Sequence, residues 1–343
     1  MGSFVLHGNI IDSESPERLR VAADSYLVCE EGRCTGVFSA LPERFSGLPL
    51  TDFGDRLILP GMTDLHLHAP QFAFRGLGMD LELLDWLNAR TFPEEAKYAD
   101  LGYAALAYGQ FVDCLRRSAT TRAVVFGTVH PAATTLLMEL LEASGLVSYV
   151  GKVNMDRDCP EALREADAAA SLAATEQWLA SARFAHTKPI LTPRFVPSCS
   201  DALLQGLGEL AARRGLPVQS HLSENLGEIA LVQSLCPQTD FYAEAYDRCG
   251  LLSQPCIMAH CVHCPPEEQD LLHAACSSRI RRFPIPTSAP ALRRSLPIWR
   301  AACASASART LPPERRKICS ASWRKPSASR SSAGVWSTIL FRR

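Results

Sequence analysis

Two histidines separated by a single residue end a short apolar run at positions 59–68. Alternate side chains of a β-strand share one face, so His66 and His68 would point the same way. Pro60 and Gly61 supply a turn before the run. Such a pair suits two ligands of one metal ion, although an isolated His-x-His pair is as readily a surface pair or a satisfied core pair.

Two further strand-like runs also end in histidine. His221 follows the run from 218, and His260 follows the run from 256. In a (β/α)8 barrel the carboxyl ends of the strands meet at one mouth, so residues distant in sequence become neighbours. We therefore predict a catalytic metal site at the mouth of a barrel.

The expected metal is one zinc ion per chain. Catalytic zinc typically takes three protein ligands, which His66, His68 and His221 could provide, and it makes a bound water acidic enough to act as a nucleophile. Imidazole also suits iron, so the residue types leave zinc and iron open.

Glu224 lies three residues after His221, just past the expected strand end. A carboxylate there could carry protons between the water and a substrate. It could equally be a carboxylate of a helix first turn, favoured by the helix dipole. The spacing alone leaves both interpretations open.

The pattern of apolar residues along the chain changes near residue 58. Residues 1–57 show short alternating runs with Gly and Pro, which predicts a small β-rich domain. From residue 58 to 277, strand candidates alternate with helical patterns, which predicts parallel βαβ units of a barrel. About six such units fit, where a closed barrel needs eight. The expected strands include 123–126, 146–153 and 189–193, and the expected helices include 132–146, 161–182 and 201–214.

Residues 278–343 do not continue this pattern and are predicted to be a basic, irregular tail. Residues 271–343 hold 15 of the 35 Lys and Arg but one of the 36 Asp and Glu. No glycine occurs from 271 to 333, although βα loops commonly use it. A basic arm for nucleic acid is the competing interpretation, but it lacks interleaved aromatic residues and a known module, so we expect no nucleic-acid partner.

The composition of the 343 residues, 47% hydrophobic and 21% charged, fits a globular protein. The sequence contains no bilayer-length apolar run and no signal-peptide pattern, so we expect a cytoplasmic protein without a membrane partner. Its 13 cysteines are expected to be free thiols. Cys261 and Cys264 could form a metal or redox pair, but the absence of a second half-site favours core or loop cysteines.

Several motifs together resemble the amidohydrolase superfamily: the His66-Leu67-His68 pair after Pro60-Gly61, the His-Leu-Ser-Glu run at 221–224, and Met258-Ala259-His260. Within that superfamily, four more segments resemble the guanine deaminases, over residues 1 to about 275. These segments are 68–71, 91–94, 192–195 and 220–225.

The resemblance implies an α/β fold: a TIM-type (β/α)8 barrel, incomplete at its C-terminal end here, with a small flanking β-sandwich. It also implies zinc-dependent hydrolysis of guanine to xanthine and ammonia, and a possible homodimer. The implied metal ligands are His66, His68 and His221, with His260 at the metal or its water and Glu224 as the proton shuttle. The implied guanine contacts are His68, Gln71, Arg194, Phe195, His221 and Glu224.

The purine contacts make physical sense. Gln71 offers a donor and an acceptor to an amide-like base edge, Arg194 donates to a carbonyl, and Phe195 stacks on a ring. Without their neighbours, Phe195 would be read as core packing and Arg194 as a surface cation. Other deaminases and chlorohydrolases remain alternatives because this barrel hosts many chemistries.

The family that this sequence resembles also uses an aspartate after a late barrel strand. No aspartate follows Asp270 in this sequence. We therefore expect very low activity, or a catalytically dead relative that still binds purine. We hypothesise a change of reading frame between about residues 265 and 283, because the shifted codons of 305–313 are compatible with a Gly-Leu-Gly-Thr-Asp run. Resequencing the coding DNA tests this directly.

Overall fold

The computed structural model describes residues 2–15 and 18–277. The N-terminal part forms one four-stranded sheet in the order β3-β2-β1-β4. Strand β1 pairs antiparallel with β2 and parallel with β4. A 3-10 turn at Glu43–Phe45 lies between β3 and β4. The strands are β1 (Phe4–Ser15), β2 (Arg18–Glu30), β3 (Arg33–Phe38) and β4 (Leu50–Ile58).

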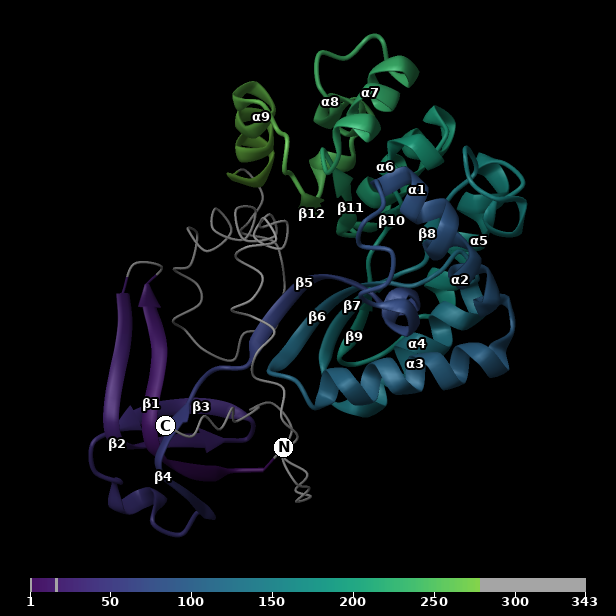
Figure 1. Ribbon diagram of the computed structural model, residues 1–343. Coiled ribbons are helices and arrows are strands. Elements are labelled where there is room, and N and C mark those ends of the chain that lie inside the picture. Colours follow the sequence, from purple (N-terminus) through teal and green to yellow (C-terminus); the bar gives the residue numbers. More distant parts are fainter. Residues whose placement is uncertain (1, 16–17, 278–343) are drawn as a thin grey trace.

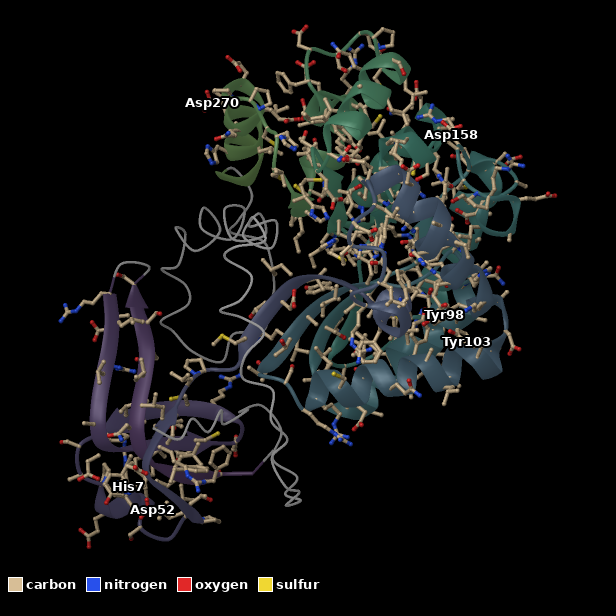
Figure 2. All side chains as sticks on the ribbon, viewed as in Figure 1. His7, Asp52, Tyr98, Tyr103, Asp158 and Asp270 are labelled. Atoms are coloured by element: carbon tan, nitrogen blue, oxygen red, sulfur yellow. The ribbon has the colours of Figure 1, made fainter. Side chains whose placement is uncertain are left out.

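Successive residues of a strand point to opposite faces of the sheet, and apolar side chains are buried on both faces. Leu6, Ile10 and Ile58 form one small apolar cluster, and Val5 and Val28 belong to another. His7 joins the parallel pair, with its Nδ1 2.9 Å from Asp52 Oδ1 (Figure 2).

The rest of the described chain builds a curved wall of parallel strands (Figure 1). One sheet has the order β5-β6-β7-β9, and two shorter pairs, β8 with β10 and β11 with β12, continue it. A bridge between Leu191 and Val218 links the pairs. The strands are β5 (Met62–His68), β6 (Thr120–Phe126), β7 (Val147–Gly151), β8 (Val153–Asn154), β9 (Thr187–Pro189), β10 (Thr192–Pro193), β11 (Val218–Leu222) and β12 (Cys256–His260).

Helices cover the outside of this wall, and α3 and α4 lie side by side against β6, β7 and β9 (Figure 1). The α/β fold with parallel strands confirms the predicted class. Within the described residues, no pairing joins β12 to β5. The helices are α1 (Leu83–Trp86), α2 (Phe92–Ala96), α3 (Leu101–Arg116), α4 (Pro131–Ser144), α5 (Ala168–Ser181), α6 (Asp201–Arg214), α7 (Leu226–Leu235), α8 (Tyr242–Arg248) and α9 (Pro266–Ser277).

Short helical turns connect these elements. A π-helical turn at Leu87–Thr91 joins α1 to α2. The 3-10 turns are Ala69–Phe74, Lys97–Ala99, Glu161–Leu163, Val196–Ser198 and Leu251–Ser253.

Most expected elements are present, and two differ for physical reasons. The helix expected over 161–182 is wrong in its first turns, because Asp167 caps Ala170 N at 2.8 Å and starts α5 there. Upstream, Glu165 instead forms an ion pair with the buried Lys152. The strand expected over 189–193 is split into β9 and β10, each containing a proline that cannot donate to a ladder.

Two sequence predictions concern residues after 277, which the structure does not describe. The basic tail at 278–343 lies outside the described residues, and so does the segment needed to judge the reading-frame hypothesis. Within residues 2–15 and 18–277, none of the helices has both the length and the apolar character to cross a bilayer.

One carboxylate, at the end of α4, holds the start of β9, the strand that follows α5. Gly145 ends α4 with a left-handed φ of 80°, which glycine adopts without strain. The side chain of Glu142 then accepts hydrogen bonds from the backbone amides of Ala185, His186 and Thr187, at 2.8 to 3.2 Å. Although partial burial opposes the charge, these bonds leave the pKa of Glu142 below its ordinary value.

We predict that Glu142→Ala lowers the free energy of unfolding by about 1 to 2 kcal/mol at neutral pH, because three backbone amides lose their acceptor. Since the folded pKa is lowered, this contribution is complete above the ordinary glutamate pKa and disappears as pH falls through the folded value. Urea unfolding at pH 7 and at pH 3 measures it. Glu139→Ala, on the exposed face of α4, is the control; an equal loss there would contradict the prediction.

Candidate active site

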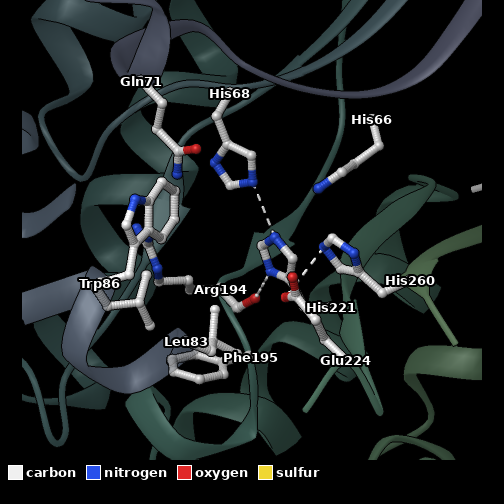
Figure 3. A pocket seen from close by; sticks show the side chains of 11 residues that line it. His66, His68, Gln71, Leu83, Trp86, Arg194, Phe195, His221, Glu224 and His260 are labelled. Carbon is white, nitrogen blue, oxygen red and sulfur yellow. Dashed lines mark hydrogen bonds and ion pairs between the residues drawn. The ribbon is translucent and has the colours of Figure 1, made fainter. Parts of the chain in front are cut away.

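Four histidines from three strands meet at the carboxyl ends of β5, β11 and β12. Relative to the His66 ring, the centroids lie 4.9 Å away for His68 and 5.0 Å away for both His221 and His260. The sequence-based expectation that these strands converge is therefore met. Figure 3 shows the four rings around one space.

Three of these histidines form the group that could hold a metal ion among the described residues. Nitrogen atoms of His66, His68 and His221 all lie within 4.8 Å of one another. His68 Nε2 and His221 Nε2 are 2.9 Å apart. Cys261 and Cys264, the alternative pair, do not belong to this group.

A single aromatic ring forms the base of the histidine cluster. Phe126, the last residue of β6, is fully buried. It stacks on His68 at 4.4 Å and contacts His221 at 4.7 Å and His66 at 5.2 Å. Because β6 pairs with β5 so that Phe126 faces His68, the ring limits the orientations open to these imidazoles.

The buried imidazoles are neutral. Burial, followed by the neighbouring His66, lowers the pKa of both His68 and His221 well below the ordinary histidine value. His221 Nδ1 lies 2.6 Å from the carbonyl oxygen of Arg194, so that nitrogen donates and Nε2 carries the lone pair. This is the protonation state that a metal ligand requires.

Glu224 and His260 form a second pair beside the cluster. Glu224 Oε2 lies 3.2 Å from His260 Nε2. Burial, with a further contribution from Glu228, raises the pKa of Glu224 to about 8, and burial lowers the pKa of His260 to about 4. A carboxyl that holds its proton near neutral pH next to a neutral imidazole can pass a proton in either direction.

The first-turn interpretation of Glu224 is wrong. Helix α7 begins at Leu226 with Asn225 as its N-cap, so Glu224 precedes the helix. The first-turn carboxylate is Glu228, which completes a capping box with Asn225.

The backbone is strained where two of the strands end. Ser223, His260 and Cys261 have φ values of 49°, 73° and 52°, a region that non-glycine residues rarely adopt. Bonds across the strand ends hold this geometry, with Cys261 N donating to Leu222 O at 2.8 Å and His263 N donating to Ser223 O at 3.0 Å. Such strain persists only where the surroundings enforce it, and it commonly marks functional sites.

All eight predicted site residues line one cavity. It contains the four histidines together with Gln71, Arg194, Phe195 and Glu224 (Figure 3). Three more lining residues were not predicted: Leu83, Trp86 and Leu87.

The unpredicted residues belong to α1 and the turn after it. Trp86 Nε1 donates to Leu77 O at 3.0 Å, and Asn225 Nδ2 donates to Glu82 Oε2 at 2.8 Å. The second bond ties the start of α1 to the start of α7. No motif identified this segment, and its only sequence signal is a tryptophan among leucines and acidic residues at 81–87.

Two alternative interpretations of the purine contacts can now be judged. Arg194 is 2% exposed, so it is not a surface cation. Its Nη1 lies 2.5 Å from Glu95 Oε2, and its guanidinium lies 5.1 Å from the centre of the Phe92 ring. Phe195 both packs in an apolar cluster with Phe126 and lines the cavity, so its two interpretations are compatible.

A buried network supports the segment that carries Glu224. Glu228 Oε2 accepts hydrogen bonds from the backbone amides of Glu224 and Asn225, at 3.0 and 3.3 Å. Its other oxygen accepts from Tyr242 OH at 3.0 Å, and that hydroxyl accepts from Val196 N at 3.3 Å. The network connects the segment after β11 to the segment after β10.

A family model described as the amidohydrolase family matches residues 57–303. The chain belongs to this family. Amidohydrolases are typically metal-dependent, which agrees with the cluster of His66, His68 and His221 at the strand ends.

Known relatives of this amidohydrolase are guanine deaminases. A probable guanine deaminase from Schizosaccharomyces pombe is 41% identical over 222 residues, covering 63% of this chain and 42% of that protein. The guanine deaminase of Escherichia coli is 36% identical over 289 residues, covering 81% and 64%. The resemblance found in the sequence is therefore confirmed, and the chain spans about half the length of most of the relatives it matches.

A solved structure gives the same result. The crystal structure of guanine deaminase from C. acetobutylicum, with guanine bound in its active site, superposes with a TM-score of 0.78 at 45% identity. The match covers 80% of this chain and 66% of that one.

For this amidohydrolase, we predict that Tyr242→Phe lowers the free energy of unfolding by about 1 to 3 kcal/mol, because the buried carboxyl of Glu228 loses a donor. Urea unfolding at pH 7 measures the change. A loss below about 0.5 kcal/mol, within the range of an ordinary surface substitution, would show that the network contributes little to stability.

Proposed function

We propose that this chain is built to bind guanine and to deaminate it hydrolytically to xanthine and ammonia. The observation that carries the proposal is the meeting of all eight predicted residues in one cavity. The similarity to a guanine deaminase whose structure holds guanine supports the substrate. No comparable observation favours the substrate of another deaminase or of a chlorohydrolase.

We propose zinc as the metal, with His66, His68 and His221 as its ligands. The neutral state of His68 and His221 and the fixed tautomer of His221 suit a borderline-soft divalent ion. When bound there, zinc supplies a nucleophile at neutral pH by acidifying water. Every other part of the proposed reaction belongs to the side chains around it.

The purine would lie against the side of the cavity opposite the histidines. Arg194 would donate to the carbonyl oxygen of guanine, Gln71 would pair with the amide-like edge, and Phe195 and Trp86 would contact the ring faces. These four side chains offer complementary chemistry within one cavity. The amine-bearing carbon C2 would then face the histidines.

Glu224 would move the protons. It would take one proton from the attacking water and deliver it to a ring nitrogen, and then take the second from the hydroxyl on the tetrahedral carbon and deliver it to the departing amine. His260, neutral and 3.2 Å away, orients the Glu224 carboxyl and stabilises charge that develops at the reacting carbon.

The activity of this chain should nevertheless be very low. The family resemblance calls for a late aspartate as a further metal ligand and proton acceptor, and no aspartate follows Asp270. Losing such a group weakens the metal and removes a proton acceptor. Guanine binding, which relies on residues before 262, should persist.

We predict that His221→Ala abolishes stoichiometric zinc binding, because one of three ligands is lost together with its contact to Arg194 O. Metal analysis of dialysed protein measures zinc per chain. The double variant Cys261→Ser/Cys264→Ser is the control and should keep the full content. Loss of zinc in the cysteine variant, with retention in His221→Ala, would place the metal elsewhere.

We further predict that the zinc-loaded chain binds guanine in preference to adenine and forms xanthine only slowly. Calorimetric titration measures binding, and chromatography measures xanthine. Glu224→Gln should remove the remaining xanthine formation and keep guanine binding within a few-fold, because the amide preserves shape but cannot accept and return a proton. Equal affinity for the two purines would contradict guanine as the substrate.

A further inference from the structure

Arg194 is a fully buried cation that contacts one carboxylate. Arg194 and Glu95 are 2% and 1% exposed, and Arg194 Nη1 lies 2.5 Å from Glu95 Oε2. The other carboxylate oxygen, Glu95 Oε1, is buried and has no hydrogen-bond partner among the described residues. Glu95 does not line the cavity, whereas Arg194 does (Figure 3).

Glu95 occupies a well-anchored element. Helix α2 places it one turn after Phe92, and the face of the Phe92 ring lies beside the guanidinium of Arg194 at 5.1 Å. Just after α2, Tyr98 OH donates to Pro70 O at 3.2 Å, next to Gln71 in the sequence. Figure 2 shows Tyr98 in this region, beside Tyr103. The scaffold that carries Glu95 is therefore also tied to the segment that carries Gln71.

We propose that Glu95 is a positioning residue that orients Arg194 toward the purine carbonyl and so determines the choice of an oxo-purine over a purine without that oxygen. The proposal rests on the proposed function. Glu95 acts only through Arg194 and touches neither the substrate nor the metal site.

The physical reason has two parts. A guanidinium has donors and no acceptor, so it favours a carbonyl and gives nothing to a ring position that bears only hydrogen. An arginine side chain also has several rotatable bonds, and holding one nitrogen on Glu95 keeps the remaining donors directed at the cavity at a small entropic cost.

The charge of Glu95 matters as well. A lone buried cation is strongly disfavoured, and it would draw water or anions into the cavity. With Glu95 ionised, the pair is neutral overall, so an uncharged purine replaces water without facing an unbalanced charge. This requirement would not exist if Arg194 were a surface residue.

The test compares guanine with 2-aminopurine, which has the same ring system and amine but lacks the carbonyl. Calorimetric titration of the zinc-loaded full chain gives the two dissociation constants and their ratio. For Glu95→Gln we expect guanine affinity to fall by about tenfold, because a charge-assisted bond becomes a neutral one, and 2-aminopurine affinity to stay within about twofold. The ratio is the decisive readout, since a merely structural role would weaken both purines equally.

Glu94→Gln is the matched control. Glu94 is also buried and adjacent in sequence, but its partners are Lys97 and Tyr103, outside the cavity. We expect its ratio to equal that of the unaltered chain. A tenfold change in the control would overturn the assignment to Glu95.

A double variant covers the case in which Glu95→Gln fails to fold. Replacing both partners with apolar residues, as Glu95→Leu/Arg194→Met, removes the buried charges together and is usually tolerated. We expect it to bind both purines with similar affinity and to match Arg194→Met in the ratio. Retention of the guanine preference in this double variant would overturn the proposal.

Guanine binding by the unaltered chain shows whether a failure lies in this proposal or in the proposed function. If it binds no guanine, both fail. If it prefers guanine and Glu95→Gln keeps the full preference, the proposed function stands and the role of Glu95 is overturned.

Discussion

The structure depends on keeping three imidazoles within about 5 Å of the His66 ring while burial lowers the pKa of all three, His68, His221 and His260. Protonated rings at such distances would repel one another strongly in a medium of low dielectric constant. The fold meets this constraint by burial, by the packing of Phe126 and by one carbonyl oxygen that fixes the tautomer of His221. Parallel strands are the means of bringing the rings together, since their carboxyl ends share one edge of the wall.

Arg194 connects the two halves of the site. Its backbone carbonyl holds His221, and its side chain lines the cavity and forms an ion pair with Glu95. A displacement of the short strand β10 would therefore disturb the metal cluster and the purine contacts together. The buried bond from Ser220 Oγ to Pro193 O, at 2.8 Å, opposes such a displacement by tying β11 to the segment before Arg194.

The histidine cluster could be predicted because each strand and its histidine are visible within a short segment of sequence. The barrel rule then brings the ends of those strands together. The sequence could not predict Glu95 or Trp86, whose roles arise from contacts across the fold. For the same reason, the helix expected over 161–182 includes Glu165, which instead forms an ion pair with Lys152. The spacing likewise left open whether Glu224 belongs to α7, which begins two residues later. Leu272 in α9 still packs into the main apolar core, so the pattern of the fold continues to that point.

The central claim is that histidines from separate strands hold one metal ion at the strand ends. X-ray absorption spectroscopy of the zinc-loaded full chain tests it most directly. The account predicts one zinc per chain with nitrogen or oxygen neighbours only, at about 2.0 to 2.2 Å. Sulfur neighbours at about 2.3 Å would contradict it, because they would place the ion on cysteines and leave the histidine cluster without its proposed role.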